Sequence, residues 1–363
     1  MKIIKVNLKD RSYDIVIGND ILRAAGKLIK KLRLGGDAFI ITNSGIKTLY
    51  GKRLADSLKK SGISARFKVV ADSEKSKSID TAIAVIKSLS QYDRKRQTFI
   101  IALGGGVIGD LAGFVASTYK RGIPYVQIPT TLLAQIDSAI GGKTAIDLKE
   151  GKNLVGAFYQ PRLIVSDISC LKSLKPRQIK AGLAEAVKYG IIKDRQLFEF
   201  LRDKRRKILA ADKQALEFTV ARCSRIKAGI IEKDERETRS LRTILNFGHT
   251  IGHAIEAASG YAGYNHGEAI ALGMLCAKDM SVKLKILKAA DAEKIEQLIN
   301  ALGLPVKIRK VSPAKIIWMH YKDKKFIGAK NRFVLIKGIG LEPVIKENVP
   351  LEIIKEVIQR RIA

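Results

Sequence analysis

The sequence predicts an α/β N-terminal domain with a mostly parallel sheet, followed by an all-helical C-terminal domain. Short β-rich runs alternate with amphipathic helical runs up to about residue 170, which is the pattern of strand–helix–strand units. Beyond that point the spacing of apolar residues is almost wholly helical. The 363 residues are also enough for two hydrophobic cores. We therefore expect domains at residues 1–170 and 171–363.

The first domain is expected to open with a β-hairpin, because the β-rich runs Ile3–Leu8 and Tyr13–Ile17 flank a polar turn. Buried strands are predicted after it at Ala38–Thr42, Ala65–Val70, Thr98–Leu103, Tyr125–Ile128 and Leu163–Val165. The helices predicted among them are Ile21–Leu32, Ile46–Lys59 and Ile79–Leu89.

The second domain is expected to contain only helices. Their predicted ranges are Arg177–Ile192, Ala215–Glu232, Leu241–Ala258, Glu268–Leu284 and Asp291–Leu302. No internal repeat or low-complexity linker separates the two halves, so we expect them to share an extensive interface. A cleft at such an interface is the usual place for a small-molecule site.

The composition is that of a globular protein with a strongly basic surface. The chain has 67 Lys and Arg against 35 Asp and Glu, a formal net charge of +32, and 46% of its residues are hydrophobic. The basic residues are spread over nearly every segment, whereas a nucleic-acid-binding protein concentrates them on one stripe or tail. We therefore expect no nucleic-acid partner, and a basic polyanion-binding protein remains the alternative.

The sequence predicts no membrane attachment. It has no stretch of about 18 uncharged apolar residues, and its first residues lack the pattern of a secretory signal. Cys170, Cys223 and Cys276 are odd in number and far apart, which argues against a disulfide framework or a cysteine zinc site. These features favour a cytoplasmic location.

A glycine-rich turn is the first chemical signal. The strand ending at Leu103 runs directly into Gly104-Gly-Gly-Val-Ile-Gly109-Asp110, and a helical pattern follows. Glycines between a strand and a helix let the backbone approach a pyrophosphate at the helix N-terminus. The turn follows a late strand rather than the first, however, and no acidic residue lies about 20 positions on. A tight structural turn is the alternative.

Residues 127–160 give the second signal, because polar side chains alternate there with Gly and Thr. Asp137, Lys143, Lys152 and Asn153 are placed so that they can converge on one polyhydroxy or phosphorylated ligand. A solvated hairpin is the other interpretation.

Histidine placement is the third signal. Three of the four histidines, His249, His253 and His266, fall close together in the sequence. The first two are four residues apart on a predicted helix, and the third lies in a turn that opens the next helix. Two or three imidazoles with a carboxylate suit a catalytic zinc site, although spacing does not say which of them are ligands. Ordinary core or surface histidines are the alternative.

Together these motifs resemble the 3-dehydroquinate synthase family. The segments that carry the resemblance are Gly104–Asp110, Pro129–Pro161, Ala181–Lys188, Leu245–Glu256 and His266–Glu268, and the match continues to residues 323–325. The resemblance implies a homodimeric lyase that uses NAD and a divalent metal, zinc or cobalt. Its substrate would be a phosphorylated sugar acid, 3-deoxy-D-arabino-heptulosonate 7-phosphate, converted to 3-dehydroquinate and phosphate in the shikimate pathway. Another sugar-phosphate cyclase or a polyol dehydrogenase of the same fold is the alternative.

The resemblance also implies the site residues. Glu185, His249 and His266 would bind the metal ion. Residues implied to act on the substrate are Asp137, Lys152, Asn153, Lys188, Arg242, Asn246 and His253, with further contacts from Arg121, Lys143, Lys325 and Glu237. Residues implied to bind NAD are Asn43, Glu74, Lys77, Gly105, Gly106, Asp110, Thr130, Thr131, Lys143, Leu174 and Gln178. Arg121 would reach into the partner subunit's site.

The sequence departs from the family pattern in two respects. Family members often have a Glu four residues before the arginine that corresponds to Arg242, but Thr238 stands at that position here. The acidic contact with the substrate is therefore assigned to Glu237 instead. The strong basicity is not a property that the family requires.

Overall fold

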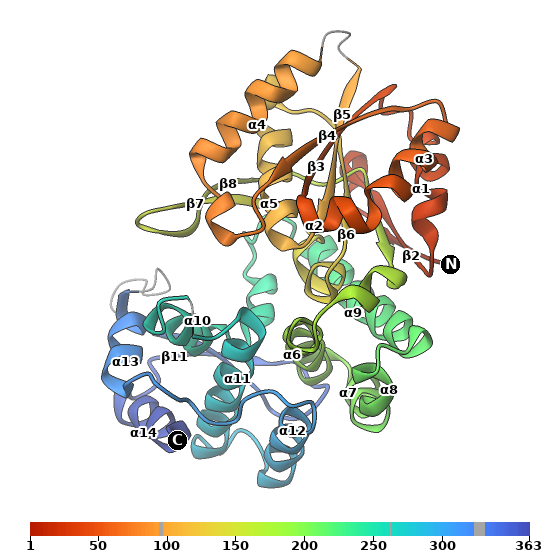
Figure 1. Cartoon of the computed structure of the whole chain (residues 1–363). Coiled ribbons are helices and arrows are strands. Elements are labelled where there is room, and N and C mark those ends of the chain that lie inside the picture. Colours follow the sequence, from red (N-terminus) through yellow and green to blue (C-terminus); the bar gives the residue numbers. More distant parts are fainter. Residues whose placement is uncertain (94–96, 262, 323–330) are drawn as a thin grey trace. The chain divides into compact units, whose positions relative to one another are not determined.

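The computed structural model describes residues 1–93, 97–261, 263–322 and 331–363. Its internal contacts divide the chain into two compact units (Figure 1). Unit 1 comprises Met1–Leu174 and Leu216–Arg236, and unit 2 comprises Lys175–Ala215 and Glu237–Ala363. The sequence placed everything after residue 170 in the second domain, whereas these contacts group Leu216–Arg236 with unit 1.

Unit 1 is built on a seven-stranded sheet with the strand order β1-β2-β9-β6-β5-β3-β4. Its strands are β1 (Lys2–Val6), β2 (Tyr13–Gly18), β3 (Asp37–Asn43), β4 (Ser64–Val70), β5 (Thr98–Gly104), β6 (Tyr125–Pro129) and β9 (Leu163–Asp167). Only β1 and β2 pair antiparallel, and every other pair in this sheet is parallel. The predicted hairpin and mostly parallel sheet are therefore confirmed.

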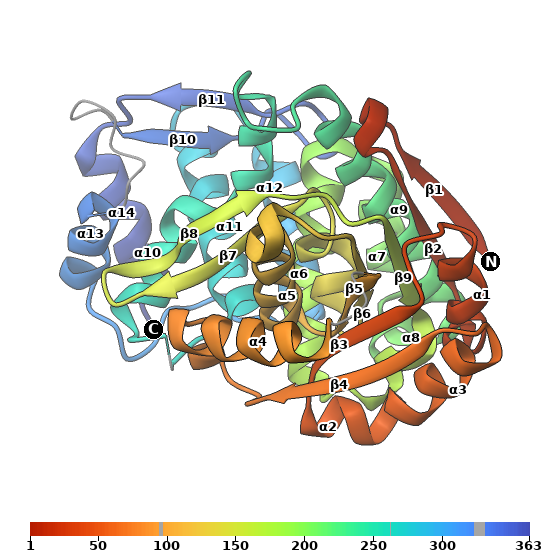
Figure 2. The same ribbon diagram turned by 90° about the horizontal axis from the view of Figure 1, so that it is seen from above.

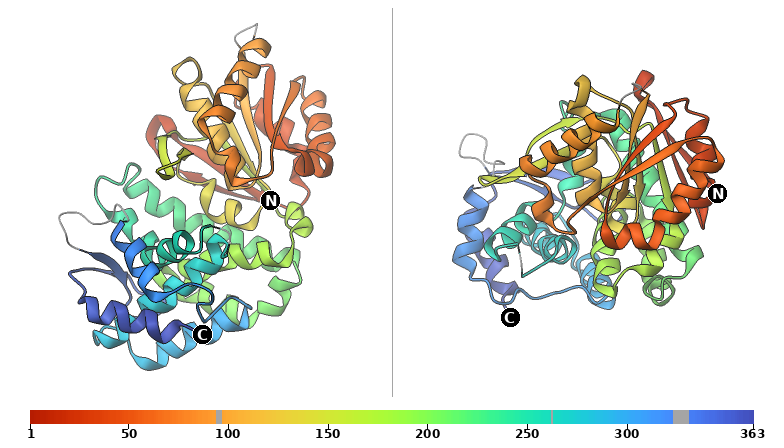
Figure 3. Two further views of the ribbon diagram at one scale, coloured as in Figure 1. Left: turned by 60° about the vertical axis from the view of Figure 1, so that its left-hand side comes forward. Right: turned by 45° about the horizontal axis from the view of Figure 1, so that its top comes forward.

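Helices cover both faces of this sheet (Figures 1 and 3). The helices of unit 1 are α1 (Ala25–Lys30), α2 (Ser44–Ile46), α3 (Lys52–Lys60), α4 (Ile79–Tyr92), α5 (Gly106–Thr118) and α9 (Lys213–Lys233). Two predicted helices are interrupted: Ile21–Ala24 is a 3-10 turn before α1, and Lys47–Gly51 is a π-type turn between α2 and α3.

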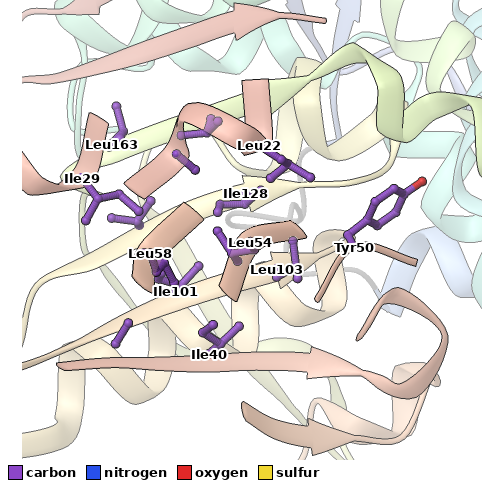
Figure 4. Packing of buried hydrophobic residues seen from close by; sticks show 14 of the residues in the cluster. Leu22, Ile29, Ile40, Tyr50, Leu54, Leu58, Ile101, Leu103, Ile128 and Leu163 are labelled. Atoms are coloured by element: carbon purple, nitrogen blue, oxygen red, sulfur yellow. The ribbon is translucent and has the colours of Figure 1, made fainter. Parts of the chain in front are cut away.

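The strand period of two divides the core between the two faces. Ala38 and Ile40 of β3 pack with α1 and α3, in the cluster shown in Figure 4. Phe39 and Ile41 point the other way and pack with α4 and α5. Because both faces are covered, the central strands β5 and β6 are buried throughout and mostly apolar, which is why their sequences gave a clear signal.

Helix α9 belongs to unit 1 because its polar side chains contact that unit. The Ser224 hydroxyl donates to the Gln135 carbonyl oxygen (3.3 Å), and Glu232 accepts from the Asn7 backbone (2.7 Å). These partners are far apart in sequence, so helical periodicity alone could not assign α9 to a unit.

A second antiparallel hairpin lies between the sheet strands β6 and β9 in unit 1. It consists of β7 (Lys143–Leu148) and β8 (Gly151–Phe158), with an irregularity in register between Ile146 and Leu148 (Figure 2). The sequence placed turns here and weighed a hairpin only as the non-functional alternative. The structure shows that the segment is a hairpin.

The described residues of unit 2 are mainly helical and include one small sheet. Its helices are α6 (Pro176–Lys193), α7 (Arg195–Asp203), α8 (Arg205–Leu209), α10 (His249–Ala258), α11 (His266–Lys283), α12 (Ala289–Ala301), α13 (Pro313–Lys322) and α14 (Leu351–Arg361). Strands β10 (Arg332–Leu335) and β11 (Val344–Glu347) pair antiparallel (Figure 2), and they were not predicted. None of the helices in the described ranges is long and apolar enough to cross a membrane.

The predicted helix Leu241–Ala258 is wrong as one continuous element. Leu241–Asn246 forms a 3-10 turn, and α10 begins only at His249. Gly248 separates the two with a φ of 80°, a left-handed conformation that breaks an α-helix.

Candidate active site

Three helices of unit 2 bring one carboxylate and two imidazoles together. Glu185 comes from α6, and His249 and His266 are the first residues of α10 and α11. Glu185 Oε1 lies 3.4 Å from His249 Nε2 and 3.1 Å from His266 Nε2. The Glu185 side chain is completely buried, so its charge must be compensated within the unit.

Close backbone contacts at glycines set this arrangement. A Cβ at Gly267 would lie 2.2 Å from the carbonyl oxygen of Ala181, so only glycine lets the start of α11 touch α6 there. A Cβ at Gly273 would lie 1.9 Å from the carbonyl oxygen of Gly248. The absence of a side chain at Gly273 therefore lets the start of α10 lie equally close to α11. The N-cap Asn265 and Glu268 form a capping box that fixes the first turn of α11.

The protonation of the three groups follows from burial and charge. Burial opposes ionisation of Glu185, but Lys188, His249 and His266 outweigh it and hold the pKa of that carboxyl well below its usual value. Burial, together with the nearby Lys188 charge, lowers the pKa of His249 and favours the neutral ring that a metal requires. Burial would also lower the pKa of His266, but hydrogen bonds and attraction from Glu185 and Glu256 raise it to about 10.

The cluster fits a divalent metal ion. Three ligands about 2.1 Å from a tetrahedral ion lie about 3.4 Å from one another, which is close to the two distances from Glu185. Ligand atoms of Glu185, His249 and His266 all lie within 4.8 Å of one another. One carboxylate and two imidazoles form a catalytic type of ligand set that leaves a position open.

His253 and Glu256 form a second, overlapping group with His266, again with atoms within 4.8 Å. The His253 ring is 5.3 Å from the His249 ring and 6.2 Å from the His266 ring, between centroids. The predicted shared face of His249 and His253 is therefore present in the structure. The sequence did not say which histidines bind metal. In the structure His266 belongs to both groups, so the two possible sites differ in their carboxylate, Glu185 or Glu256.

Unit 2 contains two buried cationic side chains among the predicted substrate residues, and one of them, Lys188, contacts the cluster. The ammonium of Lys188, one turn after Glu185, lies against Glu185 Oε2 and is 1% exposed as a residue. Arg242 is buried, and its Nε lies 3.5 Å from Glu237 Oε1. Glu237, which was assigned in place of the family's glutamate, is thus paired with Arg242 in the structure. Asn246 ends the same 3-10 turn as Arg242.

A second polar cluster lies in unit 1 around Lys77, which is 4% exposed. Its ammonium donates to Asp110 Oδ2 (2.7 Å), contacts Asn153 Oδ1 and lies 3.9 Å from Asp147. Burial would lower the pKa of Lys77, but Asp110 and the other carboxylates outweigh it and raise the pKa. Burial raises the pKa of Asp110 to about 6, against the opposing effect of Lys77.

Glu74 connects Lys152 to this cluster, lying 3.6 Å from the Lys152 ammonium and 4.0 Å from that of Lys77. The structure therefore brings together five residues that the sequence proposed for two different ligands: Glu74, Lys77, Asp110, Lys152 and Asn153. Asp147 was missed, although its carboxylate accepts from the Asn153 backbone (2.8 Å) and its own amide donates to the Lys77 carbonyl (2.6 Å).

The glycine-rich turn has the strand–turn–helix geometry that the sequence predicted. Gly104 ends β5, Gly105 is the N-cap of α5, and α5 begins at Gly106. Thr130 donates its amide to the Gly104 carbonyl (2.9 Å), and a Cβ at Gly105 would lie 3.2 Å from the Thr131 methyl. The first free N–H groups of α5 are thus held beside two threonines, an arrangement that suits a pyrophosphate.

The remaining predicted residues are more dispersed. Asp137 contacts the ammonium of Lys227, a buried lysine on α9 that the sequence did not single out. Asn43 caps α2 by accepting from the Ile46 amide (2.8 Å), and Gln178 accepts from the Lys175 amide (3.0 Å) at the start of α6.

Four further predicted residues complete the set. Lys143 is exposed at the start of β7, and Leu174 ends the 3-10 turn after β9. Arg121 is exposed at the end of the 3-10 turn Tyr119–Arg121, with a φ of 64°. Lys325 lies outside the described residues.

Comparison with known proteins settles the family. The family model described as "3-dehydroquinate synthase N-terminal" matches residues 67–181, and "3-dehydroquinate synthase C-terminal" matches residues 182–326. The 3-dehydroquinate synthase of Desulforamulus reducens is 44% identical over 348 residues, which are 96% of this chain and 97% of that protein. The chain belongs to the 3-dehydroquinate synthase family. The resemblance seen in the sequence motifs is therefore confirmed over nearly the whole length.

Solved structures of sugar-phosphate cyclases share the fold. One is 2-deoxy-scyllo-inosose synthase complexed with carbaglucose-6-phosphate, NAD+ and Co2+, with a TM-score of 0.91 and 29% identity over 99% of this chain and 100% of that chain. Another is the 2-epi-5-epi-valiolone synthase of Streptomyces hygroscopicus subsp. jinggangensis 5008 with NAD+ and Zn2+, with a TM-score of 0.88, 26% identity and 98% coverage of each chain. This family member thus has the predicted fold class of the dehydroquinate synthase type.

Proposed function

We propose that this chain is a 3-dehydroquinate synthase, a lyase that converts 3-deoxy-D-arabino-heptulosonate 7-phosphate into 3-dehydroquinate and inorganic phosphate. The observation that carries the proposal is the meeting of Glu185, His249 and His266 within 4.8 Å in a chain of this family. Those three residues would hold the divalent ion, and the glycine-rich turn with Lys77 and Asp110 would hold NAD.

When bound, NAD would supply a reversible hydride acceptor, and the divalent ion would supply Lewis acidity toward the substrate oxygens. Phosphate elimination and an intramolecular aldol closure complete the conversion. The chain's own cations match the two negative groups of this substrate, its phosphate and its carboxylate. In unit 2 we assign Lys188, Arg242 and His253 to substrate contacts, and in unit 1 we assign Lys152 and Lys143.

Two buried side chains of unit 2, Glu185 and His249, would hold the metal ion while the substrate is converted to product. Lys188 together with His249 and His266 favours the ionised form of the buried Glu185, so it offers a negative ligand at neutral pH. His249 is held neutral and offers a lone pair without first losing a proton. Preorganised ligands of this kind lower the cost of stabilising negative charge that develops on the substrate.

The test is a turnover assay with the heptulosonate phosphate, zinc and a catalytic amount of NAD. A synthase releases many equivalents of phosphate for each NAD and accumulates no NADH. A polyol dehydrogenase would accumulate NADH in proportion to product, and a polyanion-binding protein would release no phosphate. Either result would overturn the proposal.

Another sugar-phosphate cyclase activity is the second candidate, because the 2-deoxy-scyllo-inosose synthase structure matches this fold with a TM-score of 0.91. Glucose 6-phosphate in the same assay separates the two. Phosphate release from glucose 6-phosphate but not from the heptulosonate phosphate would favour this candidate.

We further propose a homodimer in the cytoplasm. Three buried free cysteines fit a reducing compartment. The exposed Arg121 is proposed to complete the partner subunit's site from the end of the 3-10 turn Tyr119–Arg121, in which Lys120 pairs with Asp93. Mixing Arg121→Ala and Lys152→Ala subunits tests this: shared sites restore part of the activity, because hybrid dimers contain one intact site. Independent sites would give no recovery.

A further inference from the structure

We propose that Glu256 is a positioning residue for the metal site: it accepts a hydrogen bond from Nδ1–H of His266 and thereby presents Nε2 of that ring to the ion. The proposal rests on the metal site assigned above and adds a residue for which neither the sequence motifs nor the family resemblance gave a role. It concerns how a ligand is oriented, and it does not make Glu256 itself a ligand.

The two edges of the His266 ring face two different carboxylates. Its Nε2 lies 3.1 Å from Glu185 Oε1, and its Nδ1 lies 3.3 Å from Glu256 Oε2. A ring can bind a metal through only one nitrogen at a time if its other nitrogen carries the proton. Nε2 of His249 lies 3.4 Å from the same Glu185 oxygen, so Nε2 is the nitrogen of His266 that converges with the other two candidate ligands.

His249 shows the same arrangement with a different acceptor. Its Nε2 lies 3.4 Å from Glu185 Oε1, while its Nδ1 lies 3.2 Å from the carbonyl oxygen of Phe247. A backbone carbonyl has no proton to give, so this contact requires a proton on Nδ1 and leaves Nε2 for the metal. Both candidate imidazoles are therefore oriented by an oxygen acceptor behind Nδ1, and Glu256 supplies the acceptor for His266.

The position of Glu256 suits this role. It lies two turns after His249 on α10, so the helix that supplies one metal ligand also orients another. Glu256 is 9% exposed, which shields the contact from competing water. A carboxylate that accepts from a metal-bound imidazole fixes the ring and makes its other nitrogen more basic, and its loss costs roughly 10–100-fold in metal affinity.

The experiment measures Co2+ binding to the full chain by visible absorbance, without substrate or NAD. Glu256→Gln keeps an oxygen that accepts from Nδ1, so we expect affinity within about threefold of the parent protein. Glu256→Ala removes the acceptor, and we expect a loss of roughly 10–100-fold with an absorbance band of the same shape. Glu256→Met gives the same contrast if the alanine variant is unfolded.

A double-mutant cycle tests whether Glu256 acts through His266. In a His266→Ala background, whose weak remaining Co2+ binding is titrated at millimolar Co2+, Glu256→Ala should cause no further loss of affinity, because the ring that it orients is gone. Glu296→Gln is the matched control: it removes another acidic group of unit 2, one paired with Arg361, and should leave Co2+ affinity unchanged.

Three results would overturn the proposal. One is Co2+ affinity in Glu256→Ala within about threefold of the parent. Another is Glu256→Gln losing as much as Glu256→Ala together with a changed band shape, which would make Glu256 a ligand. The third is an additive loss in the double mutant. Because the readout is metal binding, these outcomes are separate from whether the chain turns over the heptulosonate phosphate.

Discussion

The ammonium of Lys188 lies against Glu185 Oε2, on the opposite oxygen from the one that faces the two imidazoles. Both side chains are buried on α6, one helical turn apart. The carboxylate thus has a cation on one oxygen and the candidate metal position on the other. Lys188 stabilises the charge of Glu185 but repels a divalent ion. Its removal should therefore affect metal binding differently from the removal of a metal ligand.

Lys188→Met is therefore expected to retain zinc at least as well as the parent protein while losing turnover. Removing the positive charge takes away repulsion of the ion but also removes a cation proposed to contact the anionic substrate, for a loss of roughly 100-fold in kcat/KM. Zinc content after gel filtration and steady-state phosphate release are the two measurements. Loss of zinc from Lys188→Met would contradict this expectation and would show that Lys188 is needed to keep Glu185 ionised.

Glu185→Ala or His249→Ala should abolish metal retention and activity while leaving the chain folded. Each substitution removes one of three protein ligands, which a catalytic site with an open position cannot spare. Zinc content, circular dichroism and phosphate release report the three properties. Full activity of either variant in the presence of a chelator would contradict the metal assignment.

Lys152→Ala should lose much more turnover than stability. Its side chain is 33% exposed and lies on the β7–β8 hairpin, so its removal should change the free energy of unfolding by less than about 1 kcal/mol. We expect a loss of roughly 100-fold in kcat/KM if it contacts the substrate. Lys149→Ala on the same hairpin turn is the matched control, because Lys149 is exposed and has no proposed role. Parallel losses of stability and turnover in Lys152→Ala would indicate a structural role instead.

The pairing of Glu296 on α12 with Arg361 on the C-terminal helix α14 should make the stability of the protein depend on pH. Hydrogen bonds from Arg361, together with Lys278, lower the pKa of Glu296 to about 2 from a usual value of 4.5. The unfolded chain then binds more protons than the folded chain between these values. The stability that Glu296 contributes is thus present above about pH 4.5 and is lost as the pH falls toward about 2.

Glu296→Gln should flatten this part of the stability curve. Thermal unfolding at about pH 6 and about pH 3 should show a smaller difference in the variant than in the parent protein. An equal difference in the two proteins would mean that the pairing with Arg361 does not contribute to acid sensitivity.

The sheet of unit 1 was predictable because its strands are buried on both faces. Runs such as Phe99–Leu103 are apolar at every position, which few other elements resemble. The β7–β8 hairpin gave no such signal, since most residues of β8 are exposed and it contains two glycines. Helix α9 was predicted as a helix but not as part of unit 1, because its partners Gln135 and Asp137 are set by the fold.

The candidate site was predictable in its residue types but not in its pairings. The histidine spacing identified three imidazoles, yet periodicity could not choose among them or find Glu185 on a separate helix. That choice came from the family resemblance. The close contacts that bring α6, α10 and α11 together depend on Gly267 and Gly273, whose importance shows only in three dimensions.

Anomalous diffraction from zinc-loaded crystals, measured on both sides of the zinc absorption edge, would locate the metal ion itself. We expect one peak about 2.0–2.2 Å from a Glu185 oxygen and from Nε2 of His249 and His266. A peak bound instead by His253, Glu256 and His266, or no peak near Glu185, would contradict it.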